Sequence, residues 1–220
     1  GGLSSVGSES ARPGIVHRLD RYTSGVMVVA KNDLSHWRLA ESFAQRRTDK
    51  RYLAIVQGEV SLNHDRIDAA IGRDPQQREK MTVRTDGSGK DASTTFRVRE
   101  RYTGFTLVEL QLHTGRTHQI RVHMSHIGHP IAGDAAYGGK HQTQRDLGGV
   151  GSEPVLQRQA LHATTLKFSH PISDKKCGYT APLMSDMRCA IEVLRKHKFK
   201  GRVSVEGATV DMSQLGVESN

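Results

Sequence analysis

Two alternating stretches in the middle of the chain constrain its fold most strongly. Residues 94–102 place Phe96 and Val98 on one side, and residues 105–113 repeat the pattern with Thr106, Val108, Leu110 and Leu112. Alternation with a period of two is typical of a strand with one buried face, and Gly104 between the stretches favours a turn. We therefore expect two antiparallel neighbours in a sheet.

Other stretches predict helices and further strands. Helices are expected over residues 33–47, with Asp33 as the N-cap, and over residues 185–197. Apolar residues at three- and four-residue spacing define their buried faces, which are Leu34, Trp37, Ala40, Phe43 and Ala44 in the first helix and Met187, Ala190, Ile191 and Leu194 in the second. In this interpretation Trp37 is a core residue. Strands are expected over residues 26–30, buried on both faces, and over residues 50–58, 158–171 and 179–182. The fold class is α+β.

Composition limits the partners and the location of the protein. The 220 residues carry a net charge of +9, with a pI near 9.8, which indicates a polyanionic partner. No apolar run approaches the roughly 18 residues of a membrane span. Two cysteines, Cys177 and Cys189, make no disulfide framework. We expect a cytoplasmic protein without a membrane partner.

Low-complexity stretches suggest the domain organisation. Residues 1–12 are small and polar and are expected to be a flexible lead-in or a truncation scar, and residues 13–198 a single domain. Within it, residues 61–92 are expected to form a hairpin excursion and residues 140–157 a mobile loop. Residues 199–220 match no pattern and are expected to be a C-terminal extension.

A carboxylate between an apolar entry and a turn is the first candidate for chemistry. In residues 14–31, GIVHRLDRYTSGVMVVAK, Asp20 precedes a Thr-Ser-Gly turn and is flanked by Arg18 and Arg21. A charged group against a buried strand is costly unless it is paired or used. A lone Asp in such a setting is most often structural, so the residues alone leave both interpretations open.

A second candidate site lies in residues 114–139, where a helix is expected to begin after Thr117 and to end at Gly128. Its first turn would present backbone N–H groups and a positive dipole near Arg116, His118 and Gln119, which suits a phosphate or a carboxylate. The five histidines at 113, 118, 123, 126 and 129 raise the alternative of zinc. No cysteine or acidic ligand pattern accompanies them, so we expect no metal.

Two of these stretches resemble a known family. HRLDRYTSG, containing Asp20, and GRTHQIRVH followed by G-x-P-I-x-G-D-x-x-Y-G-G resemble the signatures of the RluA-type pseudouridine synthases, and KRYLAIVQG resembles a third family strand. The resemblance implies that Asp20 is the nucleophile, Tyr52 the second active-site residue and Arg121 the salt-bridge partner of Asp20. It also implies that Arg18 helps to displace the base and that Leu166 packs against the flipped uracil. Tyr22 departs from the pattern, because many members carry Asp there.

The same resemblance implies a fold and a reaction. The fold is the pseudouridine synthase fold, a mostly antiparallel mixed sheet with packed helices and a central catalytic cleft. The reaction isomerises a flipped-out uridine in RNA without a metal or another cofactor. We expect large-subunit ribosomal RNA as the target, with transfer RNA as the alternative, and a monomeric enzyme. The family normally has a Lys-Pro-containing strand upstream, which suggests a longer parent protein. A non-catalytic RNA-binding domain and a histidine-cluster metalloenzyme are the competing classes.

Overall fold

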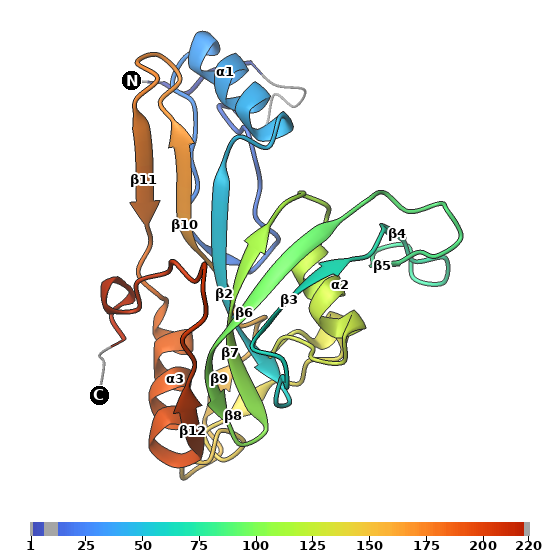
Figure 1. Cartoon of the computed structure of the whole chain (residues 1–220), viewed down its shortest axis with the longest axis vertical. Helices are drawn as coiled ribbons and strands as arrows, with labels where there is room; N and C mark the ends of the chain where they lie inside the picture. Colours follow the sequence, from blue (N-terminus) through green and yellow to red (C-terminus); the bar gives the residue numbers. More distant parts are fainter. Residues whose placement is uncertain (1, 7–12, 218–220) are drawn as a thin grey trace.

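The computed structural model describes residues 2–6 and 13–217. In that part of the chain the strands form one eight-stranded sheet with the order β1-β10-β2-β7-β6-β12, to which β11 is added beside β10 and β3 beside β6 (Figure 1). The members of this sheet are β1 (Ser24–Gly25), β2 (Asp49–Gln57), β3 (His64–Asp68), β6 (Ser93–Tyr102), β7 (Phe105–Leu112), β10 (Leu161–Ser169), β11 (Lys176–Thr180) and β12 (Phe199–Arg202).

The sheet is mixed because of one pair of strands. β1 runs parallel to β10, whereas every other pair of strands within the described part of this sheet is antiparallel. The expected hairpin is confirmed as β6 and β7, which pair from Thr94↔Leu112 to Tyr102↔Phe105. Gly104 in the connecting turn has a φ of 79°, a value that glycine adopts without a side-chain clash.

Helices and small sheets complete the domain. The helices are α1 (Asp33–Ala44), α2 (Gln119–His126) and α3 (Ser185–Lys198), with short 3-10 turns η1 (Ala135–Tyr137) and η2 (Ser213–Leu215). α1 lies at one end of the sheet and α3 at the other, where α3 packs against β6, β9 and β12 (Figure 1). The small sheets pair β4 (Ile71–Arg73) with β5 (Met81–Val83) and β8 (Gln142–Thr143) with β9 (Pro154–Leu156). Together these elements give the α+β architecture that the sequence predicts.

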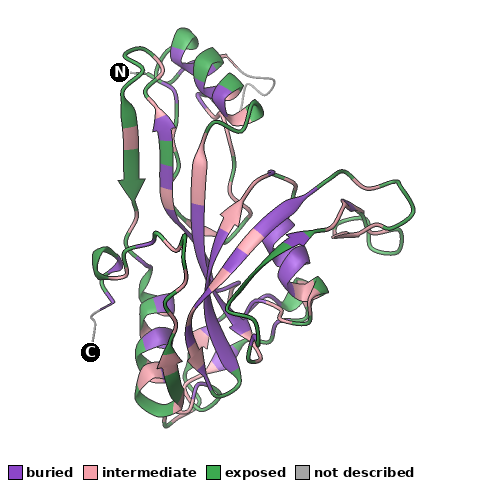
Figure 2. Ribbon diagram, in the orientation of Figure 1, coloured by how far each residue is buried: buried purple, intermediate pink, exposed green. Residues whose placement is uncertain are grey.

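The core lies on the central strands. The run from Tyr52 to Val56 in β2 is buried at every position, so β2 is covered on both faces, and the purple ribbons of β2, β6 and β7 in Figure 2 mark this centre. α3 buries Met187, Ala190, Ile191 and Leu194 against it, which are the residues that the three- and four-residue spacing predicts.

The buried face of α1 differs from the prediction. Asn32, rather than Asp33, is the N-cap, and its side chain accepts a hydrogen bond from the Ser35 amide at 2.9 Å. Leu34 is 52% exposed and Trp37 is 64% exposed, so Trp37 is not a core residue. The buried residues are Ser35, His36, Leu39 and Ser42. Leu39 packs in a second core cluster with Ala30, Leu166 and Phe168, and this contact sets the rotation of the helix.

The expected doubly buried strand at residues 26–30 is also corrected. Only Ser24–Gly25 forms a strand, and Val29 makes an isolated bridge to Ile15. Met27 and Val29 are about two-fifths exposed, whereas Val26, Val28 and Ala30 pack on the second core cluster. The segment therefore has one buried side, because no further strand of the described chain covers the other.

Segments predicted as loops or tails contribute to the fold. Leu147 and Leu156 are fully buried in the stretch expected to be a mobile loop, which contains β8 and β9. In the expected C-terminal extension, β12 pairs with β6 and the side chains of Val210, Leu215 and Val217 belong to the main core. Residues 218–220 lie outside the described part.

At the other end, the described part of the expected lead-in contacts the domain. The Ser4 amide donates to the Ala30 carbonyl at 3.0 Å, and the Ser4 hydroxyl donates to Asp33 at 2.7 Å. Residue 1 and residues 7–12 of the predicted lead-in lie outside the described residues. Within residues 2–6 and 13–217, none of the helices has the length and apolar character needed to cross a membrane.

Candidate active site

A cavity of about 1020 Å³ opens beside the middle of the sheet. Its walls come from the turn that carries Asp20, the C-terminal half of α1, the start of β2 and the loop after β7. The lining includes Val16, His17, Arg18, Leu19, Asp20, Phe43, Arg46, Arg47, Lys50, Tyr52, Thr114, Arg116, Gln119 and Leu161. The three sequence segments that carry the candidate residues therefore meet around one cavity.

The parallel pair of β1 and β10 fixes the position of the Asp20 turn. The Thr23 amide donates to the Asp20 carbonyl at 2.9 Å, and Ser24 then pairs with His162 on β10. Gly25 has a φ of 123°, and a Cβ at this position would lie 2.2 Å from the Ala163 carbonyl oxygen. Only glycine allows this close approach, so the Thr-Ser-Gly sequence holds the carboxylate at the cavity wall.

Asp20 lies beside Arg121, and Arg121 has a second carboxylate partner. The Arg121 Nη1 atom is 3.8 Å from Asp20 Oδ2, while Nε and Nη2 donate to Asp134 at 2.7 Å each. The Arg121 guanidinium also stacks over the Tyr137 ring, 4.8 Å from its centroid. This bidentate bond fixes the guanidinium plane and leaves Nη1 directed toward Asp20. Asp134 was not identified as a site residue in the sequence, although it is the Asp of the G-D pair in the second motif.

The electrostatics of this group keep it charged. Burial alone would lower the pKa of Arg121, but the hydrogen bonds to Asp134 and the charges of both carboxylates raise its pKa above the ordinary value. The side chain of Asp134 is almost fully buried, and that of Asp20 keeps about a fifth of its surface exposed. Asp20 is thus the carboxylate of the pair that a ligand in the cavity can reach.

Tyr52 lies on β2 between Leu110 of β7 and Ala163 of β10. The side chain is 7% exposed and lines the cavity. Burial, and then the negative charge of Asp20, raise the pKa of its phenol well above the usual value. The phenol is therefore protonated at neutral pH, and it offers an aromatic face and a hydroxyl rather than a phenolate.

The remaining predicted ligand-binding residues occupy different positions. Arg18 and Arg116 line the cavity, and Arg116 Nε donates to the Asp91 carbonyl at 3.0 Å. Gln119 also lines it, but its amide is used internally, since it accepts from Thr114 at 2.7 Å and donates to the Ser93 carbonyl at 2.9 Å. Gln119 therefore braces the loop that carries Arg116.

His118 and Leu166 do not line this cavity. His118, rather than Thr117, is the N-cap of α2, with a φ of 56°, and its Nδ1 lies 2.7 Å from the Tyr137 hydroxyl. Leu166 is buried in the second core cluster, so its place is core packing. Leu161, five residues earlier on β10, lines the cavity instead. A strand presents alternate residues to one face, and sequence alone does not show which residue reaches the opening.

Three further residues of the cavity, His17, Phe43 and Lys50, were not among the predicted site residues. His17 stacks on Phe43 with ring centroids 4.4 Å apart, and its Nε2 accepts a hydrogen bond from the Val28 amide. Burial and the nearby charge of Lys50 lower the pKa of His17 to about 4. Burial also lowers the pKa of Lys50, whose Nζ lies 5.9 Å from the centroid of the Phe43 ring. His17 is therefore an uncharged residue of the cavity wall. Its position three residues before Asp20, in the HRLD stretch, was the feature of the sequence that could have identified it as a site residue.

The charge of the cavity suits a polyanion. Its described lining contains five arginine or lysine residues, Arg18, Arg46, Arg47, Lys50 and Arg116, but only two acids, Asp20 and Asp49. Asp49 accepts a hydrogen bond from Arg51 at 2.9 Å. Asp20 therefore lies in a positively charged surrounding that favours phosphate groups.

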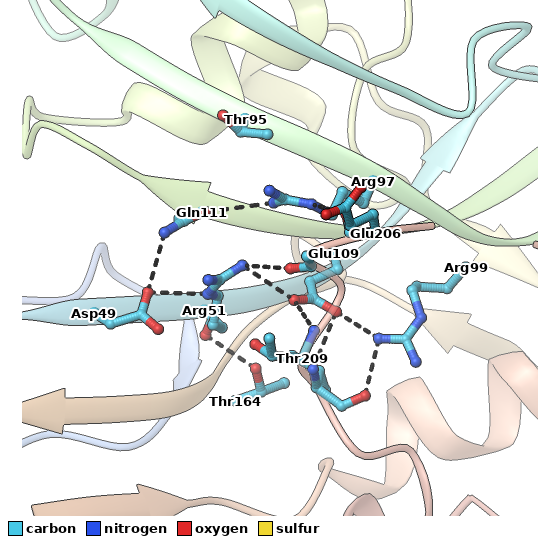
Figure 3. A network of polar contacts seen from close by, with 12 residues as sticks. Asp49, Arg51, Thr95, Arg97, Arg99, Glu109, Gln111, Thr164, Glu206 and Thr209 are labelled. Atoms are coloured by element: carbon cyan, nitrogen blue, oxygen red, sulfur yellow. Dashed lines mark hydrogen bonds and ion pairs between the residues drawn. The ribbon is translucent and has the colours of Figure 1, made fainter. Parts of the chain in front are cut away.

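A buried polar network supports the strand that carries Tyr52 (Figure 3). Arg51 contacts Asp49 and Glu109, and Glu109 also pairs with Arg99. The carboxylate of Glu109 has no exposed surface, and it accepts hydrogen bonds from the backbone amides of Thr209 at 2.9 Å and of Val210 at 3.2 Å. The network ties residues 207–210 to the start of β2, where Asp49 lines the cavity.

Four of the five histidines at 113–129 have hydrogen-bond partners in the protein: His113, His118, His123 and His129. The ring nitrogens of His123 lie 2.9 Å from the Thr94 hydroxyl and 3.0 Å from the Ala69 carbonyl, and His129 Nδ1 lies 3.1 Å from the Gln57 carbonyl. In the part of the chain that the structure describes, three or more His, Cys, Asp or Glu side chains do not come together as a metal site.

The fold is that of pseudouridylate synthase domains. The human RNA pseudouridylate synthase domain containing 4 superposes with a TM-score of 0.68 at 26% identity, and 88% of this chain and 87% of that one are covered. The human RNA pseudouridylate synthase domain containing 1 gives a TM-score of 0.66 at 28% identity, with 87% and 76% covered.

Sequence comparison gives the family. Residues 4–126 match the family model described as RNA pseudouridylate synthase. An uncharacterized RNA pseudouridine synthase, YlyB of Bacillus subtilis, is 48% identical over 186 residues, which cover 84% of this chain and 57% of that protein. The ribosomal large subunit pseudouridine synthase D of Zymomonas mobilis is 45% identical over 194 residues, covering 88% and 60%. The chain belongs to the RluA-type RNA pseudouridine synthase family, and it spans less than two thirds of the length of these curated relatives.

Proposed function

We propose that this chain is the catalytic domain of an RNA pseudouridine synthase that acts on large-subunit ribosomal RNA. The observation that carries the proposal is the arrangement of three residues from distant segments: Asp20 and Tyr52 line one basic cavity, and Arg121 lies 3.8 Å from Asp20. The relatives named ribosomal large subunit pseudouridine synthase D support the choice of RNA, and transfer RNA is the alternative target.

The reaction moves the uracil base on its ribose. The target uridine leaves its stack and enters the cavity, which is the general way in which enzymes reach a base. The N1–C1′ bond breaks, the base turns, and a C5–C1′ bond forms; C5 then loses a proton and N1 gains one. Atoms and oxidation state balance, so the rearrangement consumes no oxidant or reductant. Asp20 either attacks C1′ or assists loss of the base as a glycal.

Each candidate residue has a role in this scheme. Arg121, fixed by Asp134, orients the Asp20 carboxylate through its ion pair. Tyr52 contacts the base with its ring. Because its phenol is protonated, it acts as a relay: its oxygen accepts the C5 proton while its own proton passes to water, from which N1 gains a proton. Arg18 occupies the space that the base leaves in the RNA stack, and Arg116 binds phosphate. The enzyme acts as a monomer in the cytoplasm in this proposal.

The test is pseudouridine formation in ribosomal RNA labelled at uridine. The wild-type chain should convert uridine to pseudouridine, and Asp20→Asn should give no detectable product while RNA binding is largely retained. Asp65→Asn is the matched control, because Asp65 is exposed on β3 and does not line the cavity. Product from Asp20→Asn would contradict the role of Asp20 as the nucleophile. RNA binding by the wild type without any product would instead favour a non-catalytic RNA-binding domain.

A further inference from the structure

The turn after Asp20 holds a tyrosine in an unfavourable backbone conformation. Tyr22 has a φ of 70°, in the left-handed region. Asp and Asn tolerate this region, but a bulky aromatic residue there is a clear outlier. Such conformations persist only where the surroundings impose them, and they concentrate at functional sites. The tyrosine therefore needs an explanation other than backbone preference.

Neighbouring side chains impose this conformation. Gln159, which is buried, donates from Nε2 to the Arg21 carbonyl at 2.6 Å, and Arg158 Nη1 donates to the Tyr22 carbonyl at 2.9 Å. Asp186 holds Arg158 in place through an ion pair of 2.7 Å. The two backbone carbonyls of the turn are thus fixed, and the direction of the Tyr22 side chain is fixed with them.

The ring itself contributes little to the fold. It is 60% exposed, and its hydroxyl has no hydrogen bond to any residue in the described part of the chain. The Arg21 guanidinium lies 4.8 Å from the ring centroid. An aromatic side chain that is held out from the surface, with a cation beside it, is the arrangement on which unpaired bases of RNA stack.

The ring also belongs to a second cavity. This open cavity of about 570 Å³ is lined by Tyr22, Pro154, Val155, Gln157, Arg158 and Asp186. Asp20 and Thr23, on either side in the sequence, line the larger cavity instead. The turn therefore separates two cavities, with the candidate nucleophile at one and an exposed aromatic ring at the other.

We propose that Tyr22 and Arg21 form a binding site for the nucleotide next to the target uridine. Its base stacks on the Tyr22 ring in the second cavity, and its phosphate pairs with Arg21. This inference rests on the proposed function, because it takes the target uridine to be in the larger cavity. Asp20 and Tyr22 are two residues apart, so their Cα atoms lie at most about 7 Å from one another, which places the second base next to the first in the RNA rather than several nucleotides away.

An abasic scan tests this site directly. The probe is a fluorescein-labelled RNA nonamer with one central uridine among adenosines, prepared intact and with one abasic nucleotide at each neighbouring position in turn. Fluorescence anisotropy gives the affinity of the wild type, Tyr22→Phe and Tyr22→Asn for each probe. Removing the stacked base should weaken binding to the wild type and to Tyr22→Phe by roughly tenfold, the scale of one base–aromatic stack.

Tyr22→Asn should bind the intact nonamer roughly tenfold more weakly and show no further loss at that abasic position. Thermal denaturation checks its folding, and its melting temperature should not lie below that of the wild type, because Asn suits the left-handed region. The same abasic profile in Tyr22→Asn and in the wild type would overturn the inference, as would a flat wild-type profile or a lower melting temperature. Pseudouridine formation by the wild type is measured separately, so failure of the proposed function is recognised independently.

Discussion

The buried carboxylate of Glu109 gives a stability prediction whose size follows from its contacts. Glu109→Ala removes the partner of Arg51 and Arg99 and the acceptor of two backbone amides. Removing one member of a buried ion pair costs about 3–5 kcal/mol. Arg51 keeps its bonds to Asp49 and to the Gly207 carbonyl, which places the expected loss toward the lower figure.

Thermal and urea denaturation, followed by circular dichroism, measure this loss. At about 2–4 °C per kcal/mol for a domain of this size, a loss near 3 kcal/mol should lower the melting temperature by roughly 6–12 °C. Glu79→Ala is the matched control, since Glu79 is exposed in the excursion between β4 and β5. Such a surface substitution should change stability by no more than about 0.5 kcal/mol.

The reasoning would be refuted if the Glu109→Ala and Glu79→Ala proteins unfolded at the same temperature. That result would mean that residues 207–210 are held without the carboxylate. Glu109→Gln provides a second check, because the amide keeps the shape and can still accept from a backbone N–H group. Its loss of stability should lie between those of the two alanine variants.

Three further predictions concern the site and α1. Asp134→Asn removes the charge that orients Arg121, so the single-turnover rate of pseudouridine formation should fall about 100-fold, the scale of a small misplacement of a catalytic group. The affinity for RNA should stay within twofold of the wild type, and an unchanged rate would refute the role of Asp134. The pKa of His17 is about 4 in the folded protein and 6.5 when the residue is exposed, so between these pH values the unfolded state binds more protons. The free energy of unfolding should therefore fall by up to about 3 kcal/mol as the pH drops from 6.5 to 4. His17→Gln should lose that part of the pH dependence in urea denaturation, and an identical pH profile would contradict the buried neutral ring. Leu39→Ala should lower the free energy of unfolding by about 2–4 kcal/mol, whereas Trp37→Ala should change it by less than about 0.5, and the reverse order would contradict the orientation of α1.

The sequence predicted the parts of the fold that local patterns encode. The hairpin of β6 and β7 follows from alternation, and the buried face of α3 follows from helical spacing, because both patterns are complete within one element. The family motifs alone led us to expect Tyr52 near Asp20 and Arg121 as the partner of Asp20. Periodicity alone does not say which strands become neighbours in a mixed sheet.

The errors arose where tertiary contacts decide the outcome. The apolar stripe of α1 has helical spacing, but Ala40 and Phe43 face the cavity while Leu39 makes the core contact. In the same way, Leu166 was assigned to the cavity and Leu161 lines it. The bidentate bond from Arg121 to Asp134 joins residues 13 apart across a turn, and no spacing rule predicts it.

The polar network of Arg51 and Glu109 has a consequence for protein synthesis. Arg51 adjoins Tyr52 in β2, yet 156 residues separate Arg51 from Gly207, whose carbonyl it binds. A ribosome must therefore translate nearly the whole domain before this strand gains its final hydrogen bonds. The nascent chain should remain sensitive to proteases until residues 207–210 have left the exit tunnel.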